Sequence, residues 1–248
     1  MTETVIDYSF MLKQKRRAMF FKYSVFVIVV LTVLIVLHNF ILFSVGIASE
    51  SMQPTLATGD VVFVTPLAKP YGGKPENRSV LDRLVHCVSL NRGDLVLLNA
   101  GDDTRAPKYK KVANKIVRFI TFQRFSLFST YSDDYCVRRI LGFPGDTVYM
   151  KDFVVYIKPA DENHFLTEYE LSSGRYDVIT EKLPDKWDNG VGFSGELEPV
   201  VLGNNQYMFF SDDRYHCSDS RLWGRVDADC ISGKIVLRYW PFMSFSLF

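Results

Sequence analysis

A serine that almost directly follows a long apolar run is the residue whose position points most clearly to chemistry. The run extends from Tyr23 to Ile47, and Ser49 and Ser51 stand just beyond it. A serine hydroxyl attacks a carbonyl carbon when a neutral base lies within hydrogen-bond reach and preorganised donors stabilise the developing negative charge. The spacing therefore predicts a hydroxyl nucleophile held close to the surface of a bilayer.

The apolar run is the element that would hold this serine in place. It contains no Lys, Arg, Asp or Glu, and His38 and Asn39 alone interrupt its apolar pattern. A helix of about 20 such residues crosses a bilayer, so residues 23–47 are predicted to be a transmembrane anchor. A cleaved signal peptide is the alternative, although its apolar core is shorter and ends in a small-x-small site.

The charges that flank the run predict its direction. Basic residues precede it, and the positive-inside rule places such a flank in the cytoplasm. Residues 1–22 are therefore expected to be cytoplasmic and residues 48–248 extracytoplasmic. This arrangement predicts a single-pass protein of the cytoplasmic membrane. The basic residues before the run are Lys13, Lys15, Arg16, Arg17 and Lys22.

Residues 48–248 are predicted to form a mainly β domain. Short apolar stretches are separated there by Gly, Pro, Asp and Asn, and no helical period competes with them. Pro144-Gly145 demands a tight turn between two of these stretches. The predicted strands are residues 60–64, 93–98, 137–141, 147–150, 153–157, 206–210 and 231–239.

Two segments, one amphipathic and one apolar, each allow two interpretations. Residues 104–132 lack acidic residues and interleave basic with apolar ones, which is typical of a helix lying in a membrane interface or of a surface helix packed on a sheet. The segment after Tyr239 is almost wholly apolar or aromatic. It would either contact membrane lipid or pack into the core.

Composition excludes some function classes. Lys and Arg number 29 against 28 Asp and Glu, and so small a net charge gives no reason to expect a nucleic-acid partner. The widely spaced cysteines contain no CxxC pair, so no zinc site is predicted. Spacing alone does not decide whether any of them form disulfides. They are Cys87, Cys136, Cys217 and Cys230.

Three separated motifs follow one another along the chain: SMQPTL at residues 51–56, RRILGFPGD at residues 138–146 and SDDRYHCSDSRLWG at residues 211–224. In order and content they resemble the signature boxes of the bacterial type I signal peptidases. Gly93-Asp94 before an apolar stretch resembles a fourth box. Together with the anchor, the motifs extend over nearly the whole chain.

The resemblance implies a membrane-bound serine endopeptidase with a Ser-Lys dyad, a β-rich fold and neither metal nor cofactor. Its partners would be the signal peptides of secreted preproteins, which it would remove. By match to the motifs, Ser51 would be the nucleophile, and Ser49 would lend its hydroxyl to the oxyanion hole beside the Ser51 amide. Asp219 and Arg221 match residues that brace the active-site strands through an ion pair.

The sequence departs from the family pattern at the catalytic base. The family's lysine position holds Arg138, and Cys217 replaces a serine that hydrogen-bonds that lysine. An arginine side chain has an ordinary pKa far above neutral and therefore keeps its proton at neutral pH. A thiol is also a poor hydrogen-bonding substitute for a hydroxyl. Because an arginine stays protonated, Arg138 is not expected to act as the general base. Both changes fall at the place of the family's base.

Two functions therefore stay open. The first is a signal peptidase that cleaves with another base, for which His216, Lys115 and Lys151 are the candidates. The second is a catalytically impaired relative that binds signal peptides or partner proteins without cutting them, because loss of a base typically costs several orders of magnitude in rate.

Overall fold

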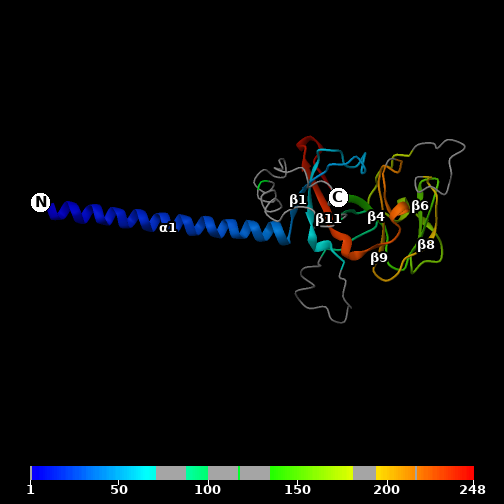
Figure 1. The fold of residues 1–248 in the computed structure, drawn as a ribbon, viewed down its shortest axis with the longest axis horizontal. Helices are drawn as coiled ribbons and strands as arrows, with labels where there is room; N and C mark the ends of the chain where they lie inside the picture. The colour runs from blue at the N-terminus through cyan, green and yellow to red at the C-terminus, as the bar shows by residue number, and fades with distance from the viewer. Residues whose placement is uncertain (1, 71–87, 100–116, 118–134, 181–193, 216) are drawn as a thin grey trace. The chain divides into compact units, whose positions relative to one another are not determined.

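The computed structural model describes residues 2–70, 88–99, 117, 135–180, 194–215 and 217–248. The chain divides into two compact units, Met1–Leu42 and Phe43–Phe248 (Figure 1). The predicted basic segment, residues 104–132, lies outside the described residues except for Val117.

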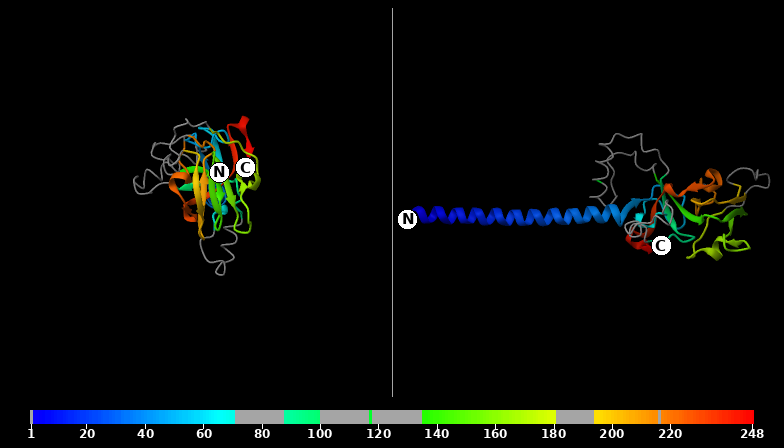
Figure 2. Two further views of the ribbon diagram at one scale, coloured as in Figure 1. Left: turned by 90° about the vertical axis from the view of Figure 1, so that its right-hand side faces the viewer. Right: turned by 90° about the horizontal axis from the view of Figure 1, so that it is seen from below.

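The first unit is the helix α1 (Thr2–Phe40), which Figure 2 shows as one continuous helix. It contains neither glycine nor proline, the two residue types that most disfavour a helix. In the part of the chain that the structure describes, no helix combines the length and the apolarity needed to cross a membrane.

The prediction of a helix up to residue 47 is wrong at its C-terminal end. The helix ends at Phe40, and Phe43–Gly46 forms strand β1, which pairs antiparallel with β2 (Val61–Thr65). The apolar run contains β-branched and aromatic residues that suit either structure. Pairing with β2, and the packing of Phe43 and Val45 against the buried core, decide in favour of a strand here.

The second unit is mainly β, as predicted, and contains two antiparallel sheets. The larger has eight strands in the order β1-β2-β11-β3-β4-β9-β10, with β12 paired to β11. Besides β1 and β2, its strands are β3 (Leu95–Asn99), β4 (Tyr135–Gly142), β9 (Gln206–Phe210), β10 (Val226–Asp227), β11 (Ile231–Trp240) and β12 (Ser246–Leu247).

The smaller sheet has four strands in the order β7-β6-β5-β8. Buried and less buried residues alternate along β5 and β6, as expected when only one face of a sheet packs against the core. The strands are β5 (Thr147–Lys151), β6 (Val154–Lys158), β7 (Leu166–Thr167) and β8 (Leu197–Val201), and the short helices α4 (Glu168–Leu171) and α5 (Ser220–Trp223) complete the elements used below.

The turn that connects the two sheets is the one predicted at Pro144-Gly145. Gly145 has a φ of 89°, a conformation that favours glycine. Asp146 accepts a hydrogen bond from Phe143 N at 2.7 Å and forms an ion pair with Arg92. The turn therefore ties the end of β4 to the start of β5.

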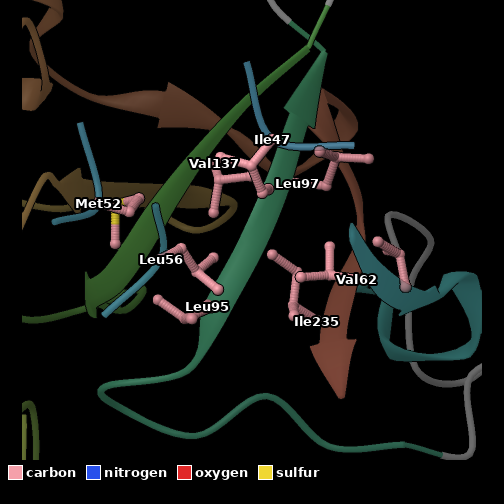
Figure 3. Close-up of a cluster of buried hydrophobic side chains, with 9 residues drawn as sticks. Ile47, Met52, Leu56, Val62, Leu95, Leu97, Val137 and Ile235 are labelled. Carbon is pink, nitrogen blue, oxygen red and sulfur yellow. The ribbon is translucent and has the colours of Figure 1, made fainter. Parts of the chain in front are cut away.

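The buried core next to the first motif positions the candidate nucleophile. Figure 3 shows Met52 and Leu56 pointing into a cluster with Leu95 and Val137, and both motif residues are fully buried. The burial of these two side chains fixes the turn that begins at Ser51.

Candidate active site

Ser51 begins a tight turn that backbone hydrogen bonds hold at both ends. Within the turn, Leu56 N donates to Met52 O at 2.7 Å. From outside it, Asp213 N donates to Ser51 O at 3.1 Å, which connects the turn to the third motif. Only 3% of Ser51 is exposed, whereas Ser49 is exposed. The Ser51 side chain is therefore buried directly beside a serine that reaches the surface.

Two side chains hydrogen-bond the Ser51 hydroxyl. Ser49 Oγ lies 2.9 Å from Ser51 Oγ, and Arg138 Nη1 donates to Ser51 Oγ at 2.7 Å. A guanidinium has only donors, so Arg138 occupies a lone pair of Ser51 and cannot accept the Ser51 proton. The structure thus brings together three positions singled out in the sequence, Ser49, Ser51 and Arg138. Their chemical roles remain predictions.

The guanidinium of Arg138 is fixed from several sides. Nε and Nη2 donate to Ser218 O at 3.1 and 2.8 Å, and Nη1 also donates to Val137 O at 2.6 Å. Its Cζ lies 5.3 Å from the centroid of the Trp223 ring, within the range of a cation–π contact. Arg138 is only 6% exposed. A group held in this way keeps its orientation toward Ser51.

Cys217 lies beside this guanidinium without replacing the expected serine contact. No hydrogen bond joins its thiol to Arg138 in the described part of the chain. Burial raises the pKa of the Cys217 thiol, and the negative charge of Asp213 adds to this, whereas Arg138 lowers it. The net pKa is raised, so Cys217 is a neutral thiol at pH 7.

Comparison with known proteins decides the family. A family model described as "Signal peptidase, peptidase S26" matches residues 20–240, which is most of the chain. This chain belongs to the signal peptidase family. The resemblance found in the motifs is thereby confirmed.

Individual members of the family are distant relatives of this chain. Signal peptidase IB of Staphylococcus aureus is 27% identical over 222 residues, which cover 88% of this chain and 87% of that protein. Probable signal peptidase I-2 of Synechocystis is 23% identical over 198 residues, covering 79% and 62% of the two chains. A crystal structure of a signal peptidase I from Enterococcus faecalis aligns with 59% of this chain and 97% of that one, at 16% identity and a TM-score of 0.30.

Asp219 and Arg221, singled out in the third motif, form a buried ion pair. Arg221 Nε donates to Asp219 Oδ1 at 2.9 Å, and Arg221 Nη2 donates to Asp219 Oδ2 at 3.0 Å. Asp219 Oδ2 also accepts from Ser211 N at 3.1 Å and from Ser211 Oγ at 2.9 Å. The pair therefore closes the segment between β9 and α5.

This carboxylate is expected to make stability depend on pH. Burial alone would raise the pKa of Asp219, but the hydrogen bonds and charge of Arg221, with the charge of Arg214, outweigh burial and lower it. A lowered pKa in the folded state adds stability above the unfolded pKa of about 3.9, and that stability is lost as pH falls through the folded value. In urea unfolding at pH 6, the free energy of unfolding of Asp219→Asn should be clearly lower than that of wild type. The difference between the two free energies should become smaller below about pH 4.

The exposed Asp229 offers the control for this experiment. Asp229→Asn removes a similar carboxylate outside the pair, and its unfolding midpoint should stay close to that of wild type at every pH. A constant gap between Asp219→Asn and wild type across the whole range would contradict the role given to the ionised Asp219.

Arg139 is a site residue that sequence reasoning missed. It follows Arg138 on β4 and points to the other face of the strand. Its Nε donates to Asp212 Oδ1 at 2.8 Å, its Nη2 donates to Thr55 Oγ1 at 3.2 Å, and its Cζ lies 3.7 Å from the centroid of the Tyr176 ring. It therefore links the Ser51 turn to the third motif. Its place directly after Arg138 in the second motif was the available signal.

The remaining candidate residues are distributed as follows. His216, Lys115 and Cys87 lie outside the described residues. Lys151 is exposed at the end of β5 in the smaller sheet and makes no contact with Ser51. Cysteines within the described residues are free thiols, namely Cys136, Cys217 and Cys230.

Proposed function

We propose that this member of the signal peptidase family is a membrane serine endopeptidase that removes signal peptides from secreted preproteins. The observation that carries the proposal is the buried Ser51 hydroxyl paired with Ser49 at 2.9 Å. Ser51 Oγ would attack the carbonyl carbon of the scissile peptide bond. The Ser51 amide and the Ser49 hydroxyl would donate to the carbonyl oxygen as it gains negative charge.

The proton of Ser51 needs an acceptor that Arg138 does not provide. Arg138 Nη1 is a donor toward Ser51 Oγ, so the base must be another group. His216 is the first candidate, because it stands two residues before Ser218, whose carbonyl oxygen accepts from Arg138. At pH 7 a large fraction of imidazole groups is neutral, and a neutral imidazole can accept a proton as a general base.

A second function is favoured by the same contact between Arg138 and Ser51. A nucleophile whose lone pair accepts a hydrogen bond from a fixed cation is less available for attack, and loss of the base typically lowers rates by orders of magnitude. In this second function the protein binds signal peptides or partner proteins without cleaving them. The apolar and hydroxyl groups around Ser51 would then serve recognition alone.

The proposed location is the cytoplasmic membrane, with residues 1–22 in the cytoplasm and the β-rich unit outside it. The basic residues that precede the apolar run support this orientation. A cluster of exposed apolar side chains near the C-terminus, Phe242, Met243, Phe245 and Leu247, supports contact with membrane lipid, since such clusters commonly mark interaction sites.

The test is cleavage and binding of a model preprotein by the purified full chain in detergent–lipid micelles. For the peptidase, wild type should release the mature protein, and Ser51→Ala should reduce release to the uncatalysed background. Ser173→Ala, a change at an exposed serine outside the site, should leave it unchanged. His216→Ala should match Ser51→Ala if His216 is the base.

The two functions give different outcomes in this assay. Equal release by wild type and Ser51→Ala would contradict the assignment of Ser51 as nucleophile. Crosslinking of intact preprotein to wild type without any release would support the binding function. Absence of both crosslinking and release would contradict both.

A further inference from the structure

We infer that Arg138 makes this site a receptor for a free peptide C-terminal carboxylate, so that a cleaved signal peptide binds more tightly than an uncleaved preprotein. The inference rests on the proposed function, because it takes the peptide to lie along Ser51 as a signal peptide would. It adds a ligand class, the C-terminal carboxylate, that the peptidase reaction does not require for recognition.

The positive charge of Arg138 has no ion-pair partner in the part of the chain that the structure describes. Three other buried arginines each form an ion pair with a buried carboxylate: Arg139 with Asp212, Arg214 with Glu168 and Arg221 with Asp219. Arg138 is also buried, but among the described residues its guanidinium donates hydrogen bonds to hydroxyl and carbonyl oxygens, and no carboxylate pairs with it. A buried cation without a counter-ion is costly, so an anionic ligand would be stabilised here.

The donors around Arg138 converge on one place. Nη1 lies 2.7 Å from Ser51 Oγ, and Ser51 Oγ lies 2.9 Å from Ser49 Oγ. Nη2 makes one hydrogen bond within the described part of the chain, to Ser218 O, and carries a second N–H. An N–H fork and hydroxyls side by side match the two oxygens of a planar carboxylate.

Two residues next to Ser51 and Arg138 reach the surface of the protein. Ser49 is exposed, and Trp223, whose ring lies against the Arg138 guanidinium, is 41% exposed. A peptide that binds here would approach the buried Ser51 hydroxyl from the side of these two exposed residues.

The identity of the carboxylate follows from the position of Ser51. A peptide placed for cleavage puts its scissile carbonyl carbon next to Ser51 Oγ. After cleavage, that same carbon is the C-terminal carboxylate of the released peptide. A peptide that keeps its register therefore presents two negatively charged oxygens to Arg138, where the uncleaved chain presents one neutral carbonyl oxygen.

The experiment compares three fluorescently labelled peptides with the same signal-peptide sequence ending in Ala-x-Ala. The first ends in a free carboxylate, the second in a carboxamide, and the third is an amide with Asp as its last residue. Binding to the full chain in detergent–lipid micelles is followed by fluorescence anisotropy. The free acid should bind about tenfold or more tightly than the amide, as expected for a charge-assisted pair.

Variants assign this preference to Arg138. Arg138→Gln should bring the acid and amide affinities to within about twofold or threefold of each other, because glutamine carries no charge and offers no N–H fork. Arg225→Gln is the matched control, since Arg225 is exposed outside the site, and it should keep the full preference.

Each outcome decides the inference. Tighter binding of the acid by wild type, lost in Arg138→Gln, supports it. Equal and measurable binding of acid and amide by wild type overturns the inference and leaves signal-peptide recognition standing, and this comparison needs no variant. If the free acid and the Asp-amide peptide bind equally tightly, the site recognises any carboxylate at the end of the peptide. That result overturns specific recognition of the C-terminus. Failure of all three peptides to bind overturns the proposed function as well.

Discussion

Replacing Arg138 with lysine is expected to raise the rate of preprotein cleavage by about 100-fold or more. A positioned general base contributes roughly 10²–10⁴ to a rate, and lysine, unlike arginine, can lose its proton when burial lowers its pKa. The position is only 6% exposed, and no carboxylate in the described part of the chain pairs with it. These conditions favour a neutral lysine next to Ser51. The measurement is single-turnover release of mature protein.

Two further variants test the chemistry behind this gain. Ser51→Ala added to Arg138→Lys should return the rate to background, because the new base acts only through Ser51. Cys217→Ser added to Arg138→Lys should increase the rate further by restoring the hydroxyl that the family places near the lysine. If Arg138→Lys folds and binds preprotein but cuts no faster than wild type, the arginine is not what limits catalysis.

Breaking the buried pair of Glu168 and Arg214 is expected to destabilise the fold by about 3–5 kcal/mol, the usual cost of leaving one charge of such a pair alone. Both side chains are fully buried, with Arg214 Nη2 and Glu168 Oε2 2.6 Å apart. Glu168 Oε1 also accepts from Val155 N at 3.0 Å, and Tyr176 donates to Oε2 at 2.6 Å. Glu168→Gln keeps the shape and removes the charge, and its unfolding is measured in urea.

A surface pair in the same region provides the control. Glu162 lies 3.6 Å from His164, and both side chains are largely exposed. Glu162→Gln should change the free energy of unfolding by less than about 1 kcal/mol, as exposed pairs generally do. A loss below about 1 kcal/mol for Glu168→Gln would show that the neutral amide satisfies the same donors and that the buried charge is not needed.

Much of the fold could be predicted because strand patterns are local. The alternating stretches at residues 147–150 and 153–157 became β5 and β6, and the Pro144-Gly145 turn lies where expected. The exception is Phe43–Gly46. Its apolar residues suit a helix as well as a strand, and pairing with β2, a contact between distant segments, decided the outcome.

The candidate site was predictable in its positions but not in its contacts. The order of the motifs located Ser51 and Ser49. The residue identity at the family's lysine position revealed the replacement by Arg138. That Arg138 donates directly to Ser51 Oγ depends on how β4 lies beside the turn. The link from Arg139 to Asp212 depends likewise on the pairing of β4 with β9, which no local pattern encodes.

The contact between Ser211 and Asp219 has a consequence for how this site can change. It closes the residues between them into a small loop whose ends are pinned together inside the core. The entropy of ordering that loop is offset by the pinned ends and by two buried side chains within it, Asp212 and Arg214, which form ion pairs. Replacing Cys217 within the loop should alter chemistry while leaving the fold almost untouched. A loop held in this way can change its chemistry at Cys217 with little risk to folding, whereas exchange of the buried Asp212 or Arg214 would also remove an ion pair that holds it.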